Sequence, residues 1–188
     1  MYEIFIRHMI RLKNILLIIS SIIICWILFY MAVSHIYFNP SISQTRGYYF
    51  AYKPSQYHLN DKVLICIRDK QQIKILHQLG VPYLSDKCQG DMPYLLKTIV
   101  AASGDIIELT GSSGVIINGV LQPNSIGVKQ YRRIELNLLQ FPPNFRLKAT
   151  EYFVMGKSKH SYDSRYFGTI RDSDIYYKAI LIYKIGNE

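Results

Sequence analysis

A long apolar run lies near the start of the chain, and shorter segments in which apolar and polar residues alternate follow it. Residues 15–33 carry no charged side chain. At a rise of about 1.5 Å per residue, a helix of this length nearly crosses a hydrocarbon core of ~30 Å, and the residues up to 37 can extend it. Trp26 and Tyr30 lie toward its far end, where aromatic rings suit a membrane interface. We therefore predict a transmembrane anchor at residues 15–37.

Basic residues precede the apolar run and determine its expected orientation. Arg7, Arg11 and Lys13 stand before it. Because basic flanks stay on the cytoplasmic side of a membrane, residues 1–14 are expected in the cytoplasm and residues 38–188 on the outer side. A cleaved signal peptide is the alternative, although the apolar run is longer than the usual ~7–15 residues of such a peptide.

Beyond residue 47 the hydrophobic period is mostly that of β-strands. Strands are expected over short segments separated by turn residues, namely 48–52, 62–67, 95–102, 105–109, 152–155 and 175–185. Residues 115–121 predict a tight hairpin, because Asn118-Gly119 supplies both positive-φ positions of a type I′ turn. Apolar residues on one side, followed by Gly80, predict a short helix over 71–79.

Turn and loop signals fill the remaining part of the chain. Residues 110–114 predict a turn, and the polar, proline-containing residues 122–149 predict an extended excursion. Many short strands with little helix are typical of a β-rich domain. The predicted fold is therefore mainly β, with a folded or barrel-like sheet in residues 38–188 after one N-terminal transmembrane helix.

Charge narrows the classes of partner. Lys and Arg number 22 against 13 Asp and Glu, a formal net charge of +9. Such an excess of positive charge can favour binding to nucleic acid or to an anionic membrane surface. Here, however, the basic residues are spread along the chain without a dense run. We therefore expect no nucleic acid partner. DNA handling is the alternative, and salt-dependent DNA binding would reveal it.

The three cysteines differ in their surroundings. Cys25 lies in the apolar run, and we expect it to act only as a small buried side chain. In an oxidising compartment Cys66 and Cys88 would form a disulfide, with two free buried thiols as the alternative. The chain has no CxxC pair and no His/Cys pair with the spacing of zinc ligands, so we expect no metal site.

Lys97 is the first candidate for chemistry, because it lies within an apolar predicted strand. Side chains alternate between the two faces of a strand, and here both faces are largely apolar. Burial disfavours the ammonium and lowers the lysine pKa from its usual ~10.4. A neutral amine can then act as a general base. The alternative is a lysine near a strand end whose amine reaches water.

Hydroxyl groups occur at two other places. Ser41 and Ser43 follow the predicted anchor directly, and a serine hydroxyl needs a base to become a nucleophile. Serines in such a stretch also serve as turn residues. Residues 161–165 combine hydroxyls with Asp163 and Arg165, which could instead form a local ion pair that holds a loop.

Three motifs in this order resemble those of bacterial type I signal peptidases, most closely the TraF-type signal peptidases of conjugation systems. Residues 39–49 are similar to the pattern N-x-[ST]-x-S-x-P-x-G-x-Y, which carries the nucleophile in that subset. A lysine followed by an apolar strand and Gly-Asp is matched at residues 97–105, and the motif S-x-D-S-R-x-x-G at residues 161–168. With the preceding anchor, the resemblance covers nearly the whole chain.

The resemblance implies a role for each matched residue. Ser43 would be the nucleophile and Lys97 its general base, while Ser41 would donate to the oxyanion. Ser161 would hydrogen-bond the lysine, and Asp163 and Arg165 would brace the site.

The resemblance also implies a fold, a place and a substrate class. The fold would be a signal-peptidase-like catalytic domain that lies in the periplasm and is anchored in the bacterial inner membrane. The substrate would be a secreted precursor, such as a conjugative pilin, from which a signal or leader peptide is cut. Attack of the substrate's own N-terminus on the acyl-enzyme would give a cyclic product. No metal or organic cofactor is implied.

The chain departs from the family pattern at several positions. Thr45 stands where proline is usual, and Gln44 replaces a more common apolar residue, which makes the surroundings of the serine more polar. Residues 156–158, Gly-Lys-Ser, replace the Gly-Asp-Asn of housekeeping signal peptidases. These departures leave the substrate open.

Two other functions remain as alternatives. A Ser–His–Asp triad could use His160 and Asp163, although neighbours in sequence do not establish triad geometry. His58 and His77 have no evident partner in the sequence. A non-catalytic, membrane-anchored scaffold protein of a secretion or conjugation apparatus is the second alternative, and it would not need Lys97 on an apolar strand.

Overall fold

The computed structural model describes residues 2–81, 88, 92–110, 114–131, 134–136 and 144–186. The chain divides into two compact units, Met1–Ile36 and Tyr37–Glu188. The first unit is the helix α1 (Tyr2–Ser34). From Arg11 to Ser34 it is long and apolar enough to cross a membrane, and a signal sequence would share these properties. The predicted helix over the apolar run is confirmed, whereas its orientation and the limits of the anchor stay predictions.

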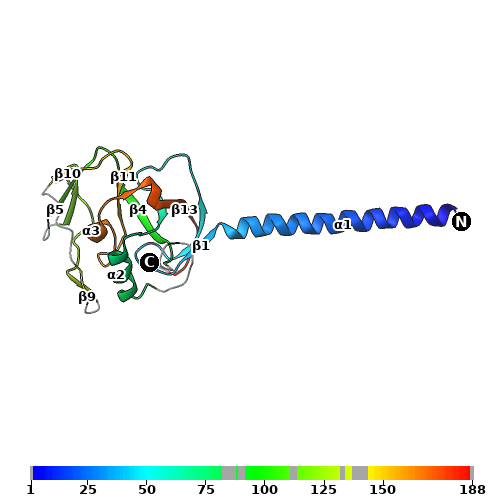
Figure 1. Ribbon diagram of the computed structural model, residues 1–188, viewed down its shortest axis with the longest axis horizontal. Helices are drawn as coiled ribbons and strands as arrows, with labels where there is room; N and C mark the ends of the chain where they lie inside the picture. Colours follow the sequence, from blue (N-terminus) through cyan, green and yellow to red (C-terminus); the bar gives the residue numbers. More distant parts are fainter. Residues whose placement is uncertain are drawn as a thin grey trace. The chain divides into compact units, whose positions relative to one another are not determined.

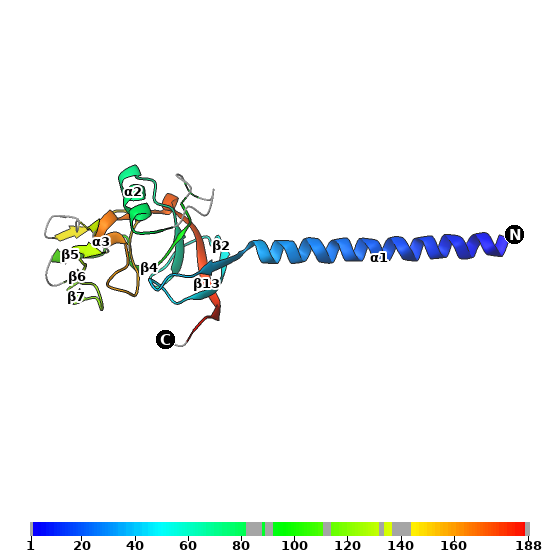
Figure 2. The same cartoon turned by 90° about the horizontal axis from the view of Figure 1, so that it is seen from below.

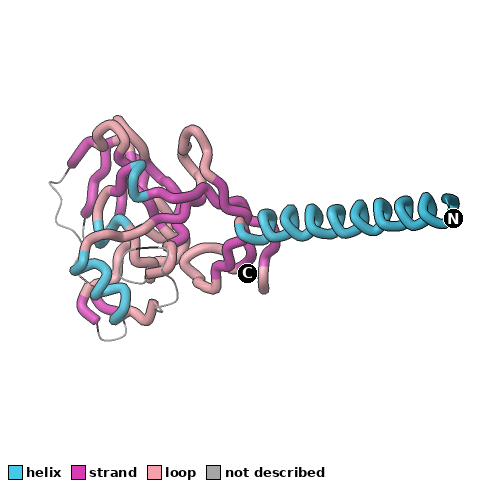
Figure 3. The backbone as a smooth tube through the Cα atoms, turned by 45° about the vertical axis from the view of Figure 1, so that its right-hand side comes forward, coloured by secondary structure: helices cyan, strands magenta, loops and turns pink. Residues whose placement is uncertain are grey.

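The second unit is built around a seven-stranded sheet with the order β1-β2-β13-β3-β4-β11-β12. Its strands are β1 (Ile36–Asn39), β2 (Gly47–Tyr52), β3 (Lys62–Ile65), β4 (Leu95–Ala101), β11 (Glu151–Met155), β12 (Ile170–Arg171) and β13 (Ile175–Lys184). Figure 3 shows that strands and loops make up most of this unit. The prediction of a mainly β fold after one apolar helix is therefore confirmed.

The centre of the large sheet is covered on both faces. Successive residues of β3, Val63, Leu64 and Ile65, are all buried although they point alternately to opposite sides. In β4, Leu96 and Lys97 are adjacent and both buried. A strand with two buried faces leaves no aqueous side for a charged residue, and this places the Lys97 amine inside the domain.

A smaller sheet has the order β10-β5-β6-β7. Its strands are β5 (Ile106–Thr110), β6 (Gly114–Ile117), β7 (Val120–Leu121) and β10 (Asn144–Arg146). The predicted hairpin is confirmed, because Asn118 and Gly119 have φ values of 50° and 80° between β6 and β7. Figures 1 and 2 show β5 at one end of the unit and β13 toward the other.

The excursion predicted over residues 122–149 needs correction. Its described residues include β8 (Gln130–Tyr131) and β9 (Ile134–Glu135), which pair with each other, and also β10. β10 pairs with β5, some 40 residues earlier. A strand of three residues is too short for an alternating pattern of apolar and polar residues to be recognised, and the sequence does not show its distant partner. The turn predicted at 110–114 falls mostly on residues 111–113, which lie outside the described residues.

Two helices and a disulfide complete the second unit. The predicted short helix is confirmed as α2 (Lys70–Gln78), and Asp69 caps it by accepting the N–H of Gln72 at 2.9 Å. A further single turn is α3 (Ser164–Phe167), and the 3-10 turn η1 spans Asp172–Asp174. The predicted disulfide between Cys66 and Cys88 is also confirmed, with Cα atoms 5.6 Å apart.

Candidate active site

The loop between β1 and β2, residues 40–46, is held by a buried asparagine. Asn39 ends β1, and its side-chain amide donates to the carbonyls of Ser41 and Thr45 at 3.0 and 3.1 Å. Its side-chain oxygen accepts the N–H of Ser41 at 3.2 Å. The Tyr49 hydroxyl donates to the Thr45 carbonyl at 2.7 Å. We call residues 40–46 the serine loop, and these bonds give it one defined conformation.

Within the serine loop, the hydroxyls of Ser41 and Ser43 lie side by side. The Ser41 hydroxyl donates to the Ser43 hydroxyl at 3.0 Å and accepts the N–H of Ser43 at 3.1 Å. An N–H and a hydroxyl therefore lie beside the Ser43 hydroxyl; here both donate within the Ser41–Ser43 pair, and both would have to turn toward an oxyanion to stabilise it. Ser41 is exposed and Ser43 is partly buried, whereas the next two residues of the loop, Gln44 and Thr45, are buried.

Lys97 extends from β4 into the interior, where its side chain is almost wholly buried. Its amine donates to the Ser161 hydroxyl at 2.9 Å. Burial lowers the pKa of Lys97 from 10.5 to about 8; Asp163 opposes this shift and Arg165 adds to it. Lys97 is thus a lysine whose neutral form is accessible near physiological pH.

Gly156 lies between the serine loop and Ser161. A Cβ at this position would overlap the Ser161 hydroxyl and would lie 2.8 Å from the Ser43 carbonyl oxygen. The Ser161 hydroxyl, which holds the Lys97 amine, therefore lies next to Ser43. Within the part of the chain that the structure describes, Lys97 and Ser43 are not hydrogen-bonded to each other directly.

Gly156→Ala is expected to lower the rate of any reaction at this site by about 100-fold, because the methyl group would push Ser43 and Ser161 apart. The measurement is the initial rate of precursor cleavage, with thermal unfolding as a check on folding. Gly186→Ala is the control for a local backbone cost, since a Cβ there meets open space but the φ of 84° is one that alanine rarely adopts; it should lower stability slightly and leave the rate unchanged. A wild-type rate in Gly156→Ala would contradict this close approach.

A buried ion pair organises the segment that carries Ser161. Arg165 donates through Nε and Nη2 to the two oxygens of Asp163, each at 2.7 Å, and both side chains are fully enclosed. Asp163 also accepts the N–H of Gly156 at 2.9 Å. A two-point arginine–carboxylate pair is among the stronger and more directional polar contacts in proteins.

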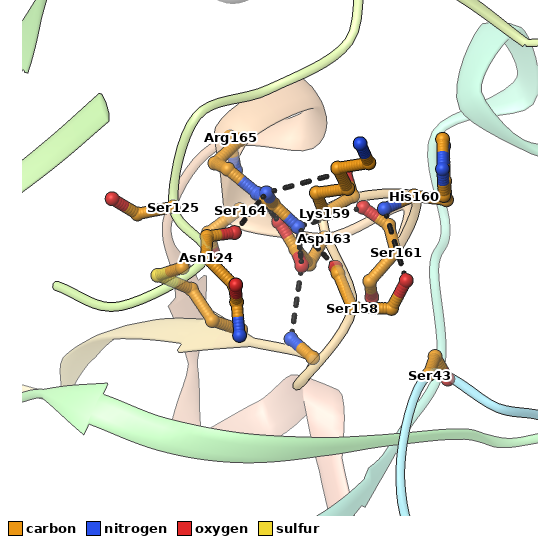
Figure 4. A network of polar contacts seen from close by, with 12 residues as sticks. Ser43, Asn124, Ser125, Ser158, Lys159, His160, Ser161, Asp163, Ser164 and Arg165 are labelled. Carbon is orange, nitrogen blue, oxygen red and sulfur yellow. Dashed lines mark hydrogen bonds and ion pairs between the residues drawn. The ribbon is translucent and has the colours of Figure 1, made fainter. Parts of the chain in front are cut away.

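The remaining donors of Arg165 bind backbone carbonyls, and Figure 4 shows the guanidinium at the centre of this network. Nη2 donates to the carbonyls of Ser158 and Ser161, both at 3.1 Å, and Nη1 donates to that of Asn124 at 3.2 Å. The pair thus joins the segment around Ser161 to the loop that carries Asn124, and the bracing role expected of it stays a prediction.

The alternative triad receives no support from these contacts. Both oxygens of Asp163 are engaged by Arg165 and by the N–H of Gly156. The backbone N–H of His160 donates to the Ser158 hydroxyl at 3.1 Å, and its ring lies 5.4 Å from that of Tyr131. The geometry favours Lys97 over His160 as the partner of a serine.

The structure brings the six predicted residues into one region: Ser41, Ser43, Lys97, Ser161, Asp163 and Arg165. Asn39 and Gly156 also contribute, and neither has a role that was predicted from the sequence. Asn39 is the first residue of the matched pattern, and Gly156 is the first residue of the segment 156–158 that differs from the housekeeping pattern. Their contacts, however, could not be predicted from the sequence. Among the described residues, no group of three or more His, Cys, Asp or Glu could hold a metal ion.

Comparison with known proteins gives a family match over almost the whole chain. The profile of a family described as signal peptidase, peptidase S26, matches residues 8–184. Two curated relatives, each described as plasmid transfer protein TraF of Escherichia coli, are 34% identical over 89 and 90 residues. The first match covers 47% of this chain and 50% of the relative, and the second 47% and 49%. The chain thus spans about half the length of the curated relatives that it matches.

A solved structure is also similar. It is a signal peptidase I from Enterococcus faecalis V583, with 16% sequence identity and a TM-score of 0.37. The match covers 67% of this chain and 98% of that protein.

Proposed function

Because the chain belongs to the signal peptidase family, peptidase S26, we propose that it is a membrane-anchored serine endopeptidase. It cleaves a signal or leader peptide from a secreted precursor, with Ser43 as nucleophile and Lys97 as general base. The observation that carries the proposal is the buried Lys97 amine, which is held by Ser161 next to Ser43 and has a pKa of about 8.

The proposed chemistry uses the groups that lie near Ser43. The neutral amine of Lys97 takes the proton of the Ser43 hydroxyl as that oxygen attacks the scissile carbonyl. The new oxyanion accepts hydrogen bonds from the Ser43 N–H and the Ser41 hydroxyl, a stabilisation of about 3 kcal/mol per donor. The Lys97 ammonium then protonates the leaving amine, and the neutral amine activates the water that hydrolyses the acyl-enzyme.

The titration of Lys97 predicts a pH profile. The folded pKa of about 8 lies below the ordinary 10.5, so the active neutral form should accumulate as the pH rises through 8. We expect kcat/KM to rise about tenfold per pH unit below 8 and to level off above it. Rates measured from pH 6 to 10 test this. A profile still rising at pH 10 would indicate an ordinary lysine, and a flat one would exclude Lys97 as the base.

The substrate class rests on the relatives. The two curated relatives are named plasmid transfer proteins, which supports a substrate in a conjugation apparatus, such as a pilin precursor. Cleavage can end in hydrolysis, or in cyclisation if the N-terminus of the substrate attacks the acyl-enzyme. In cyclisation the serine ester is broken by an amine, so the product lacks one water relative to the linear peptide.

A membrane location has support from both units. The apolar helix from Arg11 to Ser34 can span a bilayer, and the strands that follow it expose aromatic rings. Phe38, Tyr48 and Phe50 are each more than one-third exposed on β1 and β2. Aromatic side chains of this kind favour the interface between lipid and water, which supports a catalytic domain that works at a membrane surface. The periplasmic side is proposed from the basic residues before the apolar run.

Co-expression with a candidate pilin precursor tests the proposed function. Mass spectrometry should find the precursor trimmed by the wild-type chain but not by Ser43→Ala or Lys97→Ala. A product one water lighter than the linear peptide would establish cyclisation. Equal trimming by all three chains would overturn the catalytic assignment, and a cellular phenotype that both variants retain would favour the scaffold alternative.

A further inference from the structure

We propose, as a deepening of the function proposed above, that Lys157 selects substrates with an acidic side chain near the scissile bond. The inference rests on the position of Lys157 beside the serine loop and on the lack of a counter-charge for its amine.

Lys157 contacts the serine loop twice. Its backbone N–H donates to the Ser43 carbonyl at 2.8 Å, and its amine donates to the Thr45 hydroxyl, also at 2.8 Å. The backbone contact keeps the residue against Ser43, and the side-chain contact keeps the ammonium over Thr45. The residue itself is exposed, so a bound substrate can reach the charge.

The ammonium of Lys157 has no acidic partner among the described residues, whose ion pairs all involve other cations. Lys178, by contrast, is paired with Asp61 at 2.6 Å, and Arg165 with Asp163. The Thr45 hydroxyl is neutral and uses one of three donors on the amine. Lys157 therefore presents a positive charge and two remaining donors to whatever binds at the site.

The reach of this charge follows from chain geometry. Thr45 is two residues beyond Ser43, and consecutive Cα atoms are about 3.8 Å apart. A substrate bound as an extended strand advances about 3.3 Å per residue. The Lys157 amine is thus within reach of substrate side chains up to two or three residues from the scissile bond. A carboxylate there would form a charge-assisted hydrogen bond.

Paired peptides test this selection. Peptides with Glu or Gln at each of the three positions on either side of the scissile bond are incubated with the full-length chain in detergent. Because an exposed ion pair contributes little, we expect Glu to raise kcat/KM about two- to fivefold at one position, and added salt to reduce the preference. Lys157→Glu should reverse it, so that Lys is preferred to Gln there. Lys159→Glu, on the same segment, is the control and should keep the preference for Glu.

The outcomes distinguish a failure of the proposed Lys157 selectivity from a failure of the proposed peptidase function. Equal cleavage of Glu and Gln peptides at all six positions, with Ser43→Ala inactive, would overturn the role of Lys157 and leave the peptidase intact. An unchanged preference for Glu in Lys157→Glu would also overturn it. If no peptide is cleaved, or if Ser43→Ala cleaves them equally, both proposals are wrong.

Discussion

Replacing Lys97 with alanine is expected to slow precursor cleavage by about 10²- to 10⁴-fold, because the substitution removes the general base. Loss of activity alone would not separate chemistry from folding, since Lys97 lies in a buried central strand. Lys97→Met is the informative partner, because methionine fills nearly the same volume without an amine. It should lose as much activity as Lys97→Ala.

The methionine variant should also be more stable than the wild type at neutral pH. Lowering the pKa of Lys97 from 10.5 to about 8 corresponds to roughly 3 kcal/mol by which the fold disfavours the ammonium. Below pH 8 both the folded and the unfolded chain bind the proton, and the folded chain bears this penalty in full. Between pH 8 and 10.5 the unfolded chain binds more protons, so wild-type stability rises with pH.

Thermal unfolding at pH 7 and pH 10 measures this effect. We expect Lys97→Met to unfold at a higher temperature than the wild type at pH 7, with a smaller difference at pH 10. A variant that is inactive but more stable can only have lost a functional group. If Lys97→Met is active, or if it is less stable at pH 7, the role assigned to the amine is wrong.

Replacing Arg165 with alanine is expected to lower the free energy of unfolding by about 3–5 kcal/mol, because the Asp163 carboxylate would remain buried without a partner. The backbone carbonyls of Ser158, Ser161 and Asn124 would lose their donors as well. Since the pair also fixes the segment that holds Ser161, cleavage should fail even where the variant still folds.

Arg68→Ala is the matched control for Arg165→Ala. Arg68 pairs with Asp174 at 3.4 Å, but its side chain is 51% exposed, so its loss should cost less than about 1 kcal/mol. Urea unfolding of the two variants in detergent gives the comparison. Similar losses in both would mean that the Asp163–Arg165 pair contributes no more than an exposed pair and does not brace the site.

The sequence predicted those parts of the molecule that depend on local pattern. The burial of Lys97 followed from apolar neighbours on both faces of its strand, and the hairpin at Asn118-Gly119 followed from turn chemistry. The short strands β1, β10 and β12 were not foreseen, because two to four residues carry too little periodicity and their pairing partners lie elsewhere in the chain.

In the candidate site, too, the residues that belong to a sequence motif could be predicted, whereas the contacts between distant segments could not. Ser43 and Lys97 were visible because each belongs to a motif, and Ser161 was assigned to the lysine only through the resemblance. The positioning contacts of Asn39 and the close approach at Gly156 depend on which backbone atoms meet in the folded chain. No spacing in the sequence encodes that meeting, so these two residues were found only in the structure.

The most direct test of Ser43 as nucleophile is the intact mass of the full-length chain after rapid mixing with a peptide ester and acid quench. We expect one added acyl group, mapped to Ser43 by fragmentation, and none in Ser43→Ala. Acylation should slow as the pH falls below 8. An acyl group on another residue, or equal acylation of Ser43→Ala, would contradict the proposal that Ser43 is the nucleophile.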